Sequence, residues 1–273
     1  MSGSPPPGKQ NYQGGSSSSS DPQQQLISRP VQRHLVHVYL VLAAMLGISA
    51  IGATTQSPFN GLIETGVTFG SAMGVMTLPR DNMFRWPLLG TYSLFSGMSL
   101  SFLIQQFLYM DPSGTLLLGA LSAAMFIFLG LSASATLANR RSMIYVGGIA
   151  GSLLGLLAWT GIANLFFFGS RSLFSAELYL GLIAFSGFVI YDTQMIIERA
   201  SAGIRDIPGH AMDLFMDLFS LFVRIAIIFL ERENNNNNRR GRRRRRDDDD
   251  DNNNNNNNFN RGWRSFSSRR SRF

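Results

Sequence analysis

The sequence predicts an all-α protein: a multi-spanning membrane helix bundle with six transmembrane helices plus a seventh spanning or re-entrant helix. Two observations carry this prediction. The 273 residues are 45% hydrophobic and only 15% charged, and apolar runs recur along most of the chain. Each run is close to the roughly 20 residues that cross an apolar core of about 30 Å. The runs cover residues 35–55, 61–78, 88–108, 115–137, 143–165, 174–197 and 211–230.

Short polar connections separate these runs. Charged and polar residues at 81–85 divide the second run from the third, and an Asp-Pro-Ser-Gly turn at 111–114 divides the third from the fourth. Asn and Arg at 139–141 divide the fourth from the fifth. Because such residues end helices and form turns, neighbouring helices are expected to pack against one another. The connections therefore predict one compact bundle.

The arginines in these connections predict an orientation, because Lys and Arg accumulate on the cytoplasmic side of membrane proteins. They alternate along the chain, at Arg29 and Arg33, Arg80 and Arg85, Arg140 and Arg141, and Arg199 and Arg205. The opposite connections hold only Arg171. We therefore expect a cytoplasmic N-terminus. Seven full crossings would put the arginine-rich tail on the side opposite the cytoplasm. Either the seventh segment is re-entrant and returns the tail to the cytoplasm, or it spans the membrane and the tail does not follow the charge rule.

The composition divides the chain into three parts. Residues 1–29 are expected to form a disordered polar leader, 30–233 the membrane helix bundle, and 234–273 a disordered Asn/Arg/Asp-rich tail, because low-complexity polar segments bury too little apolar surface to fold. The formal charge of +7 belongs to residues 232–273, which hold 13 Arg and 6 acidic residues. It therefore does not indicate a nucleic-acid partner for the bundle. The leader has no apolar segment behind a basic start, so we expect no cleavable signal peptide.

Several kinds of chemistry are not expected. The chain has no Cys, which excludes disulfides and Cys-based metal sites. His34 and His37 are three residues apart, but no nearby carboxylate completes a zinc site, and both they and His210 lie near membrane boundaries. We therefore expect interfacial histidines. There is no phosphate-binding glycine loop and no recognisable Ser/His/Asp arrangement, so we expect neither an enzyme nor a bound cofactor.

Two glycine series with four-residue spacing predict close helix packing, because small residues on one face let helix backbones approach each other. They are Gly66, Gly70 and Gly74 in the second run, and Gly147, Gly151 and Gly155 in the fifth. No chemistry is assigned to them.

The last apolar run carries a polar stripe. At about 100° per helical residue, Asp213, Asp217, Ser220 and Arg224 all lie on one face of residues 211–230. Charges inside a membrane are costly unless they face a cavity or a partner, so the stripe is a candidate ion or proton site. Arg224 lies two turns beyond Asp217. It is a candidate charge partner that offsets negative charge or guards the far side of a pore.

A second intramembrane acid, Asp192, lies near the end of the sixth run. Counted from the connection between the last two runs, Asp192 and Asp217 lie at similar depth, roughly 10 Å, whereas Asp213 lies at about 5 Å. Two carboxyl groups in contact in a partly dry site cannot both ionise cheaply, so they can share one proton. Without that proton they repel unless a cation such as Ca²⁺, which prefers carboxylate oxygens, lies between them. The alternative is a static polar network that fixes helix register.

Five short motifs occur in order along the core. They are Val31-Gln32-Arg33-His34-Leu35 with Val38-Tyr39, Arg140-Arg141-Ser142 with Gly147-Gly148, Asn164-Leu165-Phe166-Phe167, Gly181 through Asp192-Thr193-Gln194 with Ile196-Ile197-Glu198, and Met212-Asp213-Leu214-Phe215 with Asp217. Together they resemble the Bax inhibitor-1 family, also called the transmembrane Bax inhibitor motif family, over about residues 30–233.

The resemblance implies a multi-pass protein of the endoplasmic reticulum that suppresses programmed cell death and lowers luminal Ca²⁺ through a pH-sensitive leak. It implies that Asp192 and Asp217 form the sensor, with Asp213 adjacent, and that Ca²⁺ binds only transiently at the pair, as the transported ion. The implied partners are the lipid bilayer, Ca²⁺, H⁺ and Bcl-2-type cell-death regulators. The chain departs from the family in two places: its second helix has no Arg to pair with Asp192, as some prokaryotic relatives have, and its tail has Arg, Asp and Asn blocks in place of lysines.

Two other functional classes remain open. A membrane adaptor would bind cell-death regulators without transport, and its aspartates would matter only for stability. An intramembrane aspartyl protease would also place two aspartates on neighbouring helices. Such enzymes carry a Gly-x-Gly-Asp motif, whereas Asp213 follows His-Ala-Met, so the protease is the less favoured class.

Overall fold

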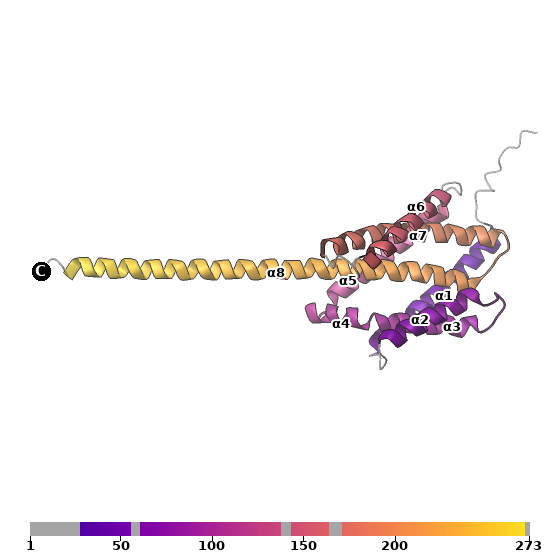
Figure 1. Cartoon of the computed structure of the whole chain (residues 1–273), viewed down its shortest axis with the longest axis horizontal. Coiled ribbons are helices and arrows are strands. Elements are labelled where there is room, and N and C mark those ends of the chain that lie inside the picture. The colour runs from indigo at the N-terminus through magenta and orange to yellow at the C-terminus, as the bar shows by residue number, and fades with distance from the viewer. Residues whose placement is uncertain (1–27, 56–60, 138–142, 164–170, 271–273) are drawn as a thin grey trace, which may run out of the picture.

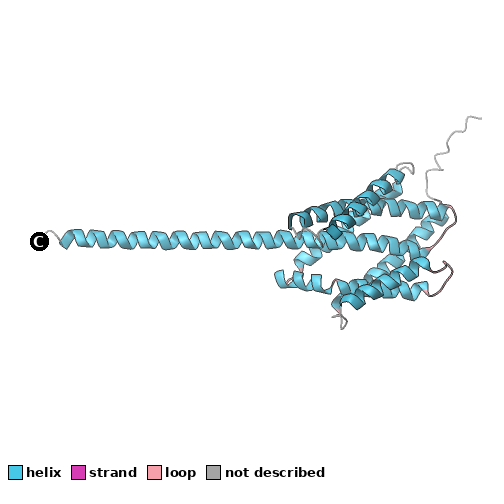
Figure 2. Ribbon diagram, viewed as in Figure 1, coloured by secondary structure: helices cyan, strands magenta, loops and turns pink. Residues whose placement is uncertain are grey.

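The structure, a computed structural model, describes residues 28–55, 61–137, 143–163 and 171–270. Almost all of the predicted leader lies outside these ranges, as do Arg140 and Arg141. Every regular element in the described ranges is a helix (Figure 2), which confirms the all-α prediction. The helices are α1 (Arg29–Thr54), α2 (Gly61–Thr77), α3 (Arg85–Ser99), α4 (Ser101–Met110), α5 (Thr115–Leu137), α6 (Met143–Ala163), α7 (Arg171–Ser201) and α8 (Ile207–Arg270).

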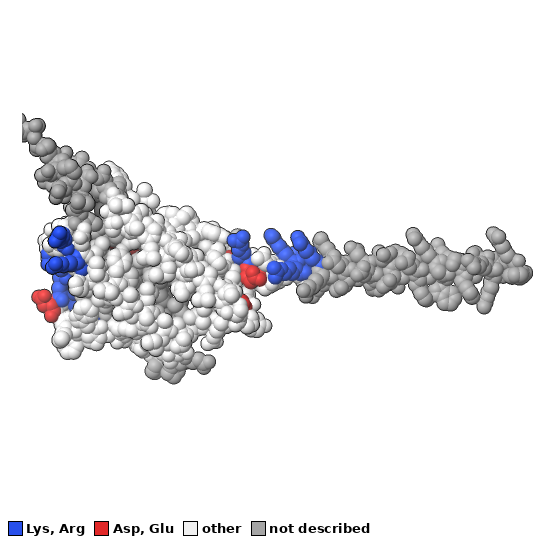
Figure 3. Space-filling model, turned by 180° about the vertical axis from the view of Figure 1, so that it is seen from behind, with Lys and Arg blue, Asp and Glu red and all other residues white. Residues whose placement is uncertain are grey.

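Five helical stretches of the described chain are long and apolar enough to cross a membrane: α1, α3 together with α4, α5, α6 and α7. Helix α2 is shorter, with 17 residues, and the apolar part of α8 contains three charged residues. Figure 3 shows a broad uncharged surface between basic side chains at one end of the bundle and charged side chains near the start of the tail. Such a surface suits contact with lipid chains, and the multi-spanning prediction is confirmed.

Helix α8 forms the centre of the bundle (Figure 1) and packs against α7, α5 and α1. Its apolar part is buried by protein at Ala211, Met212, Phe215 and Leu221. The helix continues through the bundle without reversing, which is the geometry of a spanning rather than a re-entrant segment. The tail therefore leaves the bundle at the end opposite the α2–α3 and α7–α8 connections.

Helix α8 continues beyond the bundle as one helix to Arg270, through most of residues 234–273, for which the sequence analysis expects a disordered tail. The physical reason is that the first turn of a helix is the costly step, and a helix that has already formed extends without a second nucleation cost. Asn- and Arg-rich residues can therefore continue a helix that the bundle has started.

The third apolar run also differs, because it is divided at Leu100 into α3 and α4. Ser96, Gly97 and Ser99 lie directly before the division, and the Ser99 hydroxyl donates to the Ser96 carbonyl. Gly and Ser pairs of this kind commonly bend helices. Gly97 also packs against the backbone of α1 at Ser49, so any side chain there would push α1 and α3 apart.

The two glycine series provide tight helix contacts at one position each. A Cβ at Gly74 would stand 2.8 Å from the Leu88 side chain of α3, and a Cβ at Gly147 would stand 2.5 Å from the Tyr191 ring of α7. No described atom lies within 4 Å of such a position at the other four members, Gly66, Gly70, Gly151 and Gly155. Four-residue spacing shows a small-residue face, whereas the neighbouring helix decides which of its glycines are covered.

Candidate functional site

Helices α7 and α8 bring two intramembrane aspartates into contact. Asp192 lies in the last third of α7, and Asp217 lies about three turns into α8. Their carboxyl groups are near enough to interact directly. A hydrogen bond between two carboxyl groups needs a proton on one of them, because two ionised carboxylates have none to donate. The structure thus brings together the same two aspartates that the depth estimate pairs.

Asp217 has few other polar contacts. Its side chain is 4% exposed, and in the described part of the chain its Oδ2 atom has no conventional hydrogen-bond donor. Its neighbours along α8, Leu218 and Leu221, are buried and apolar. A buried polar group without a partner is costly. Separating α7 from α8 would remove the contact with Asp192 and would therefore destabilise the buried Asp217 carboxyl group.

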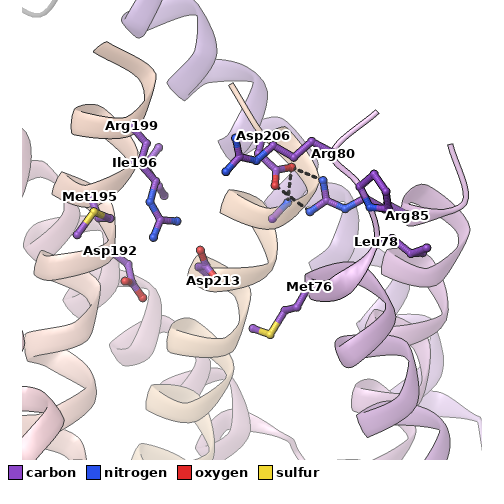
Figure 4. A pocket seen from close by; sticks show the side chains of 12 residues that line it. Met76, Leu78, Arg80, Arg85, Asp192, Met195, Ile196, Arg199, Asp206 and Asp213 are labelled. Carbon is purple, nitrogen blue, oxygen red and sulfur yellow. Dashed lines mark hydrogen bonds and ion pairs between the residues drawn. The ribbon is translucent and has the colours of Figure 1, made fainter. Parts of the chain in front are cut away.

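Asp213 lies one turn before Asp217 and faces a cavity of about 570 Å³. Asp192 lines the same cavity from α7, and Figure 4 shows both side chains directed into it. The cavity extends to the α2–α3 and α7–α8 connections, where Arg80 and Asp206 line it. Since a liquid water occupies about 30 Å³, the cavity has room for several waters and a small cation.

Arg224 is not at the aspartate pair. Its guanidinium carbon lies 4.4 Å from the centre of the Phe185 ring on α7, a cation–π contact. The side chain also passes so close to Gly181 that only glycine fits there. Its Nε is buried without a hydrogen-bond partner among the described residues, and the acidic group that interacts with it electrostatically is Glu177. The contacts of Arg224 are thus with Phe185, Gly181 and Glu177, and its role as a charge partner for the aspartates stays a prediction.

The cation that does face the aspartates is Arg199, which the sequence analysis used only for orientation. It lies seven residues after Asp192, hence on the same face of α7, and lines the cavity. Figure 4 shows its guanidinium directed toward Asp192 and Asp213, and it interacts electrostatically with both. The spacing of seven residues in one helix is the sequence signal that could have identified it.

An ion pair at the loop end of the cavity was also missed. Arg85 Nη1 and Nη2 donate to the two carboxylate oxygens of Asp206, each at 2.8 Å. Burial by itself would raise the pKa of Asp206, but hydrogen bonds from Arg85 and the Gly209 N–H, together with the Arg85 charge, hold the pKa below its usual value. The residues are 121 positions apart, so nothing local in the sequence connects them.

The histidines form a buried contact rather than an interfacial one. His34 Nε2 on α1 and His210 Nδ1 on α8 are 2.9 Å apart, and both residues are buried. One ring must donate and the other must accept, so at least one ring nitrogen is unprotonated. His37, by contrast, is exposed and hydrogen bonds to the carbonyl of Arg33 one turn earlier. The pair joins α1 to the start of α8.

A hydroxyl network lies beside Asp192. The hydroxyls of Tyr39 on α1 and Ser132 on α5 are hydrogen bonded, and Ser132 Oγ lies 3.0 Å from Thr193 Oγ1 on α7. The next residue, Gln194, donates to a backbone carbonyl of α5 at 2.8 Å. These bonds fix the part of α7 that carries Asp192 against two other helices.

The carboxylates of this site are not arranged as a fixed metal centre. Across the described ranges, no group of three or more His, Cys, Asp or Glu side chains could hold a metal ion. The site instead has two carboxyl groups in contact and a third, Asp213, that reaches the cavity. This arrangement can store a proton and can bind a cation transiently.

Known proteins resemble this chain over most of its length. The family described as "Inhibitor of apoptosis-promoting Bax1" matches residues 31–235. Bax inhibitor 1 of Arabidopsis thaliana is 38% identical over 208 residues, which cover 75% of this chain and 83% of that protein. Bax inhibitor 1 of Oryza sativa subsp. japonica is 35% identical over 76% of this chain and 84% of its own length. The Homo sapiens protein of that name is 34% identical over 76% and 90%.

The matched residues begin in α1 and end in α8, and they include Asp192, Asp213 and Asp217. The match therefore extends over the helices that surround the cavity and is not confined to one motif. On these similarities, the chain belongs to the Bax inhibitor family of multi-pass membrane proteins.

Proposed function

We propose that this protein is a pH-sensitive Ca²⁺ leak of the endoplasmic-reticulum membrane that suppresses programmed cell death, with its N-terminus in the cytoplasm. The observation that carries the proposal is the approach of Asp192 on α7 to Asp217 on α8, beside a cavity that Asp192 and Asp213 line. The names of the relatives, Bax inhibitor 1, support the cell-death role.

The shared proton acts as the connection between the two helices. While one carboxyl group keeps its proton, the pair is attractive and holds α7 against α8. When that proton leaves, two negative charges face each other in a poorly solvated site, where repulsion is much stronger than in water. The helices then separate, or a cation takes the place of the proton.

Ca²⁺ is the cargo that suits this position. It is a hard ion that binds carboxylate oxygens, and it tolerates an irregular coordination in which water completes the few ligands that the protein offers. Beyond the Arg85–Asp206 ion pair, Asp213 is the next carboxylate that a cation entering from the loop end meets, and the Asp192–Asp217 pair lies further in. Protons and Ca²⁺ thus compete for the same oxygens, which makes the flux depend on pH.

The test is Ca²⁺ flux from liposomes that contain the purified protein and a Ca²⁺-sensitive dye. The wild type is expected to release Ca²⁺ at a rate that depends on pH, and an Asp192→Asn/Asp217→Asn double variant to lose that dependence. Glu64→Gln provides a matched control, because Glu64 is an acid at the start of α2, outside the cluster. An unchanged rate and pH response in the double variant would disprove the proposal.

An adaptor function is the second candidate, and the observation that favours it is the name of the relatives, which refers to Bax. In this function the protein binds Bcl-2-type cell-death regulators in the membrane, without transport. The two functions are compatible and differ in one outcome. If cells that express a folded Asp192→Asn/Asp217→Asn variant survive a death stimulus as well as cells with the wild type, protection does not need the leak.

No catalytic activity is proposed. The family is generally one of non-enzymatic membrane proteins. Cleavage of a membrane-embedded peptide by the purified protein, blocked by an aspartyl-protease inhibitor, would overturn this view.

A further inference from the structure

One guanidinium at the loop end of the cavity ties three segments together. Arg85, the first residue of α3, pairs through both terminal nitrogens with Asp206, the residue before α8. Its Nε donates to the carbonyl of Val75, near the end of α2, at 2.9 Å. Bidentate pairs of this kind are among the stronger hydrogen-bonded contacts in proteins, and this one is nearly dry, with the two side chains 3% and 14% exposed.

Gly209 makes the close approach possible. Its N–H donates to Asp206 Oδ1 at 3.1 Å. A Cβ at this position would stand 2.6 Å from Asp206 Oδ2 and 3.2 Å from Arg85 Nη2. The first distance is shorter than real Cβ contacts allow, so any larger residue would displace the carboxylate from the guanidinium. The sequence thus provides a charge pair and also the space that the pair requires.

The ion pair lines the same cavity as the aspartates. Arg85, Asp206 and Gly209 form its wall at the connections, and Asp192 and Asp213 lie further in (Figure 4). Seven residues of chain separate Asp206 from Asp213, or about 10 Å along a helix. The α2–α3 and α7–α8 connections have no covalent link to each other, so this contact holds them together at the cavity's outer end.

We propose that Arg85, Asp206 and Gly209 form a closure that controls access from the loop end to the aspartate cluster. While the ion pair is intact, the two connections stay together and the cavity is narrow at that end. When it breaks, the start of α8 separates from α3 and the cavity opens. The inference rests on the proposed function, because the cluster it guards is the proposed ion site.

The closure differs from the aspartate pair in its response to pH. The hydrogen bonds to Asp206 hold its pKa below the usual value, so Asp206 stays ionised at neutral pH. Acidification in the physiological range therefore does not break the closure by protonating Asp206. A conformational change of the connections must break the closure instead. Access to the aspartate cluster is then controlled separately from the protonation of the aspartates.

Access can be measured by cysteine labelling, because the chain has no cysteine of its own. In a Met195→Cys background, the new thiol lies on α7 and faces the cavity. The measured quantity is the rate of reaction with a membrane-impermeant, positively charged thiol reagent. Adding Asp206→Asn is expected to raise this rate about tenfold or more, since hydrogen bonds to charged groups stabilise a closed state by at least that factor.

Two further variants test the closure without removing either charge. Gly209→Ala keeps the charges but displaces them, and Arg85→Lys keeps the charge but cannot form the bidentate pair. Both are expected to raise the labelling rate. If Asp206→Asn does not fold, as judged by size-exclusion chromatography, Gly209→Ala and Arg85→Lys decide the question.

The matched control is Asp111→Asn. Asp111 is likewise a loop aspartate that accepts hydrogen bonds, but it lies in the α4–α5 connection. It is expected to leave the labelling rate at Met195→Cys unchanged. Folded variants of Asp206, Gly209 and Arg85 that label at the wild-type rate would overturn the closure. Labelling requires no ion flux, so this result is independent of whether the leak itself exists.

Discussion

The two halves of the apolar part of α8 meet different surroundings. The half after Ile207 carries Asp213 and Asp217 and borders a polar cavity. The half toward Leu230 packs into an apolar cluster with α4 and α5, and Arg224 is the charge it carries. The polar stripe predicted from the sequence is therefore not one uniform face. The acidic groups lie in the half that borders the cavity, and Arg224 lies in the half that packs into the apolar cluster.

This difference gives the site a direction. A cation entering from the loop end meets oxygen ligands and a cavity, whereas one entering from the other end meets apolar side chains and then the positive charge of Arg224. In the proposed leak, the far half would act as a barrier and the near half as a binding region. The variants below test this division from the largest expected effect to the smallest.

A new carboxyl group should be tolerated very differently in the two halves. Ala226 is fully buried in the far half, so Ala226→Asp leaves a charge without a partner and is expected to lower the free energy of unfolding by about 3–5 kcal/mol. Met195 lies on α7 and faces the cavity that the near half of α8 borders, so Met195→Asp should lower the free energy of unfolding clearly less. Thermal unfolding in one detergent measures both, and equal losses would contradict the division.

The ion pair at the loop end should contribute more to stability than the polar contacts at the opposite end. Asp206→Asn is expected to cost about 1.5–3 kcal/mol, because hydrogen bonds to charged groups are lost. Asp111→Asn, in an exposed turn, should cost less. The two variants can be compared in the same unfolding assay, and a larger loss for Asp111→Asn would show that the ends are not organised in this way.

The pH dependence of the Asp206→Asn effect follows from the lowered pKa of Asp206. The folded-state pKa lies below the unfolded value of about 4, so the stabilisation is complete above that value and is lost as pH falls through the folded pKa. The difference between wild type and variant should therefore be constant from about pH 5 to 8 and disappear in stronger acid. If the stability difference between wild type and Asp206→Asn changes near neutral pH, Asp206 is not held ionised by the Arg85 ion pair in this range.

Arg224 should affect stability and flux, but not the pH response. Arg224→Lys keeps the charge and weakens the contact with Phe185, at an expected cost of about 0.5–1 kcal/mol. Arg224→Met removes the charge, and Ca²⁺ flux should rise because the barrier in the far half is lowered. The pH at which flux is half-maximal should stay where it is in the wild type. If the pH of half-maximal flux shifts, or if the pH dependence is lost as in the aspartate variant, Arg224 is coupled to the pair and the two halves are not separate.

A similarly small effect is expected from the hydroxyl network beside Asp192. Tyr39→Phe removes one hydrogen bond to Ser132 and should cost about 0.5–1.5 kcal/mol. Tyr145→Phe is a suitable control, because Tyr145 is an exposed tyrosine on α6. An equal change in both variants would show that the network does not contribute to holding α7.

The parts of the fold that depend on local pattern could be predicted from the sequence. Apolar run length gave the helices, and counting residues from the connection between the last two runs paired Asp192 with Asp217. Depth can be counted from a sequence because a helix rises by a fixed distance per residue. The division at Leu100 was less visible, because a run of apolar residues does not show where packing bends it.

The parts that depend on distant residues could not be predicted. Arg85 and Asp206 are 121 positions apart, and His34 and His210 are 176 apart. The sequence analysis assigned Arg85 to a connection and the two histidines to membrane boundaries, but such positions do not specify a contact. The contacts of Arg224 could not be predicted for a related reason: helix periodicity shows which residues share a face, whereas the neighbouring helix decides what that face touches.

The most direct test of the central claim, that Asp192 and Asp217 share one proton, is infrared difference spectroscopy across a pH series. A protonated carboxyl group has its own carbonyl band, which hydrogen bonding shifts. We expect the wild type to show such a band and both Asp192→Asn and Asp217→Asn to lose it, while Asp213→Asn keeps it. A band that persists unchanged in both single variants would show that the proton is elsewhere, and it would contradict the account.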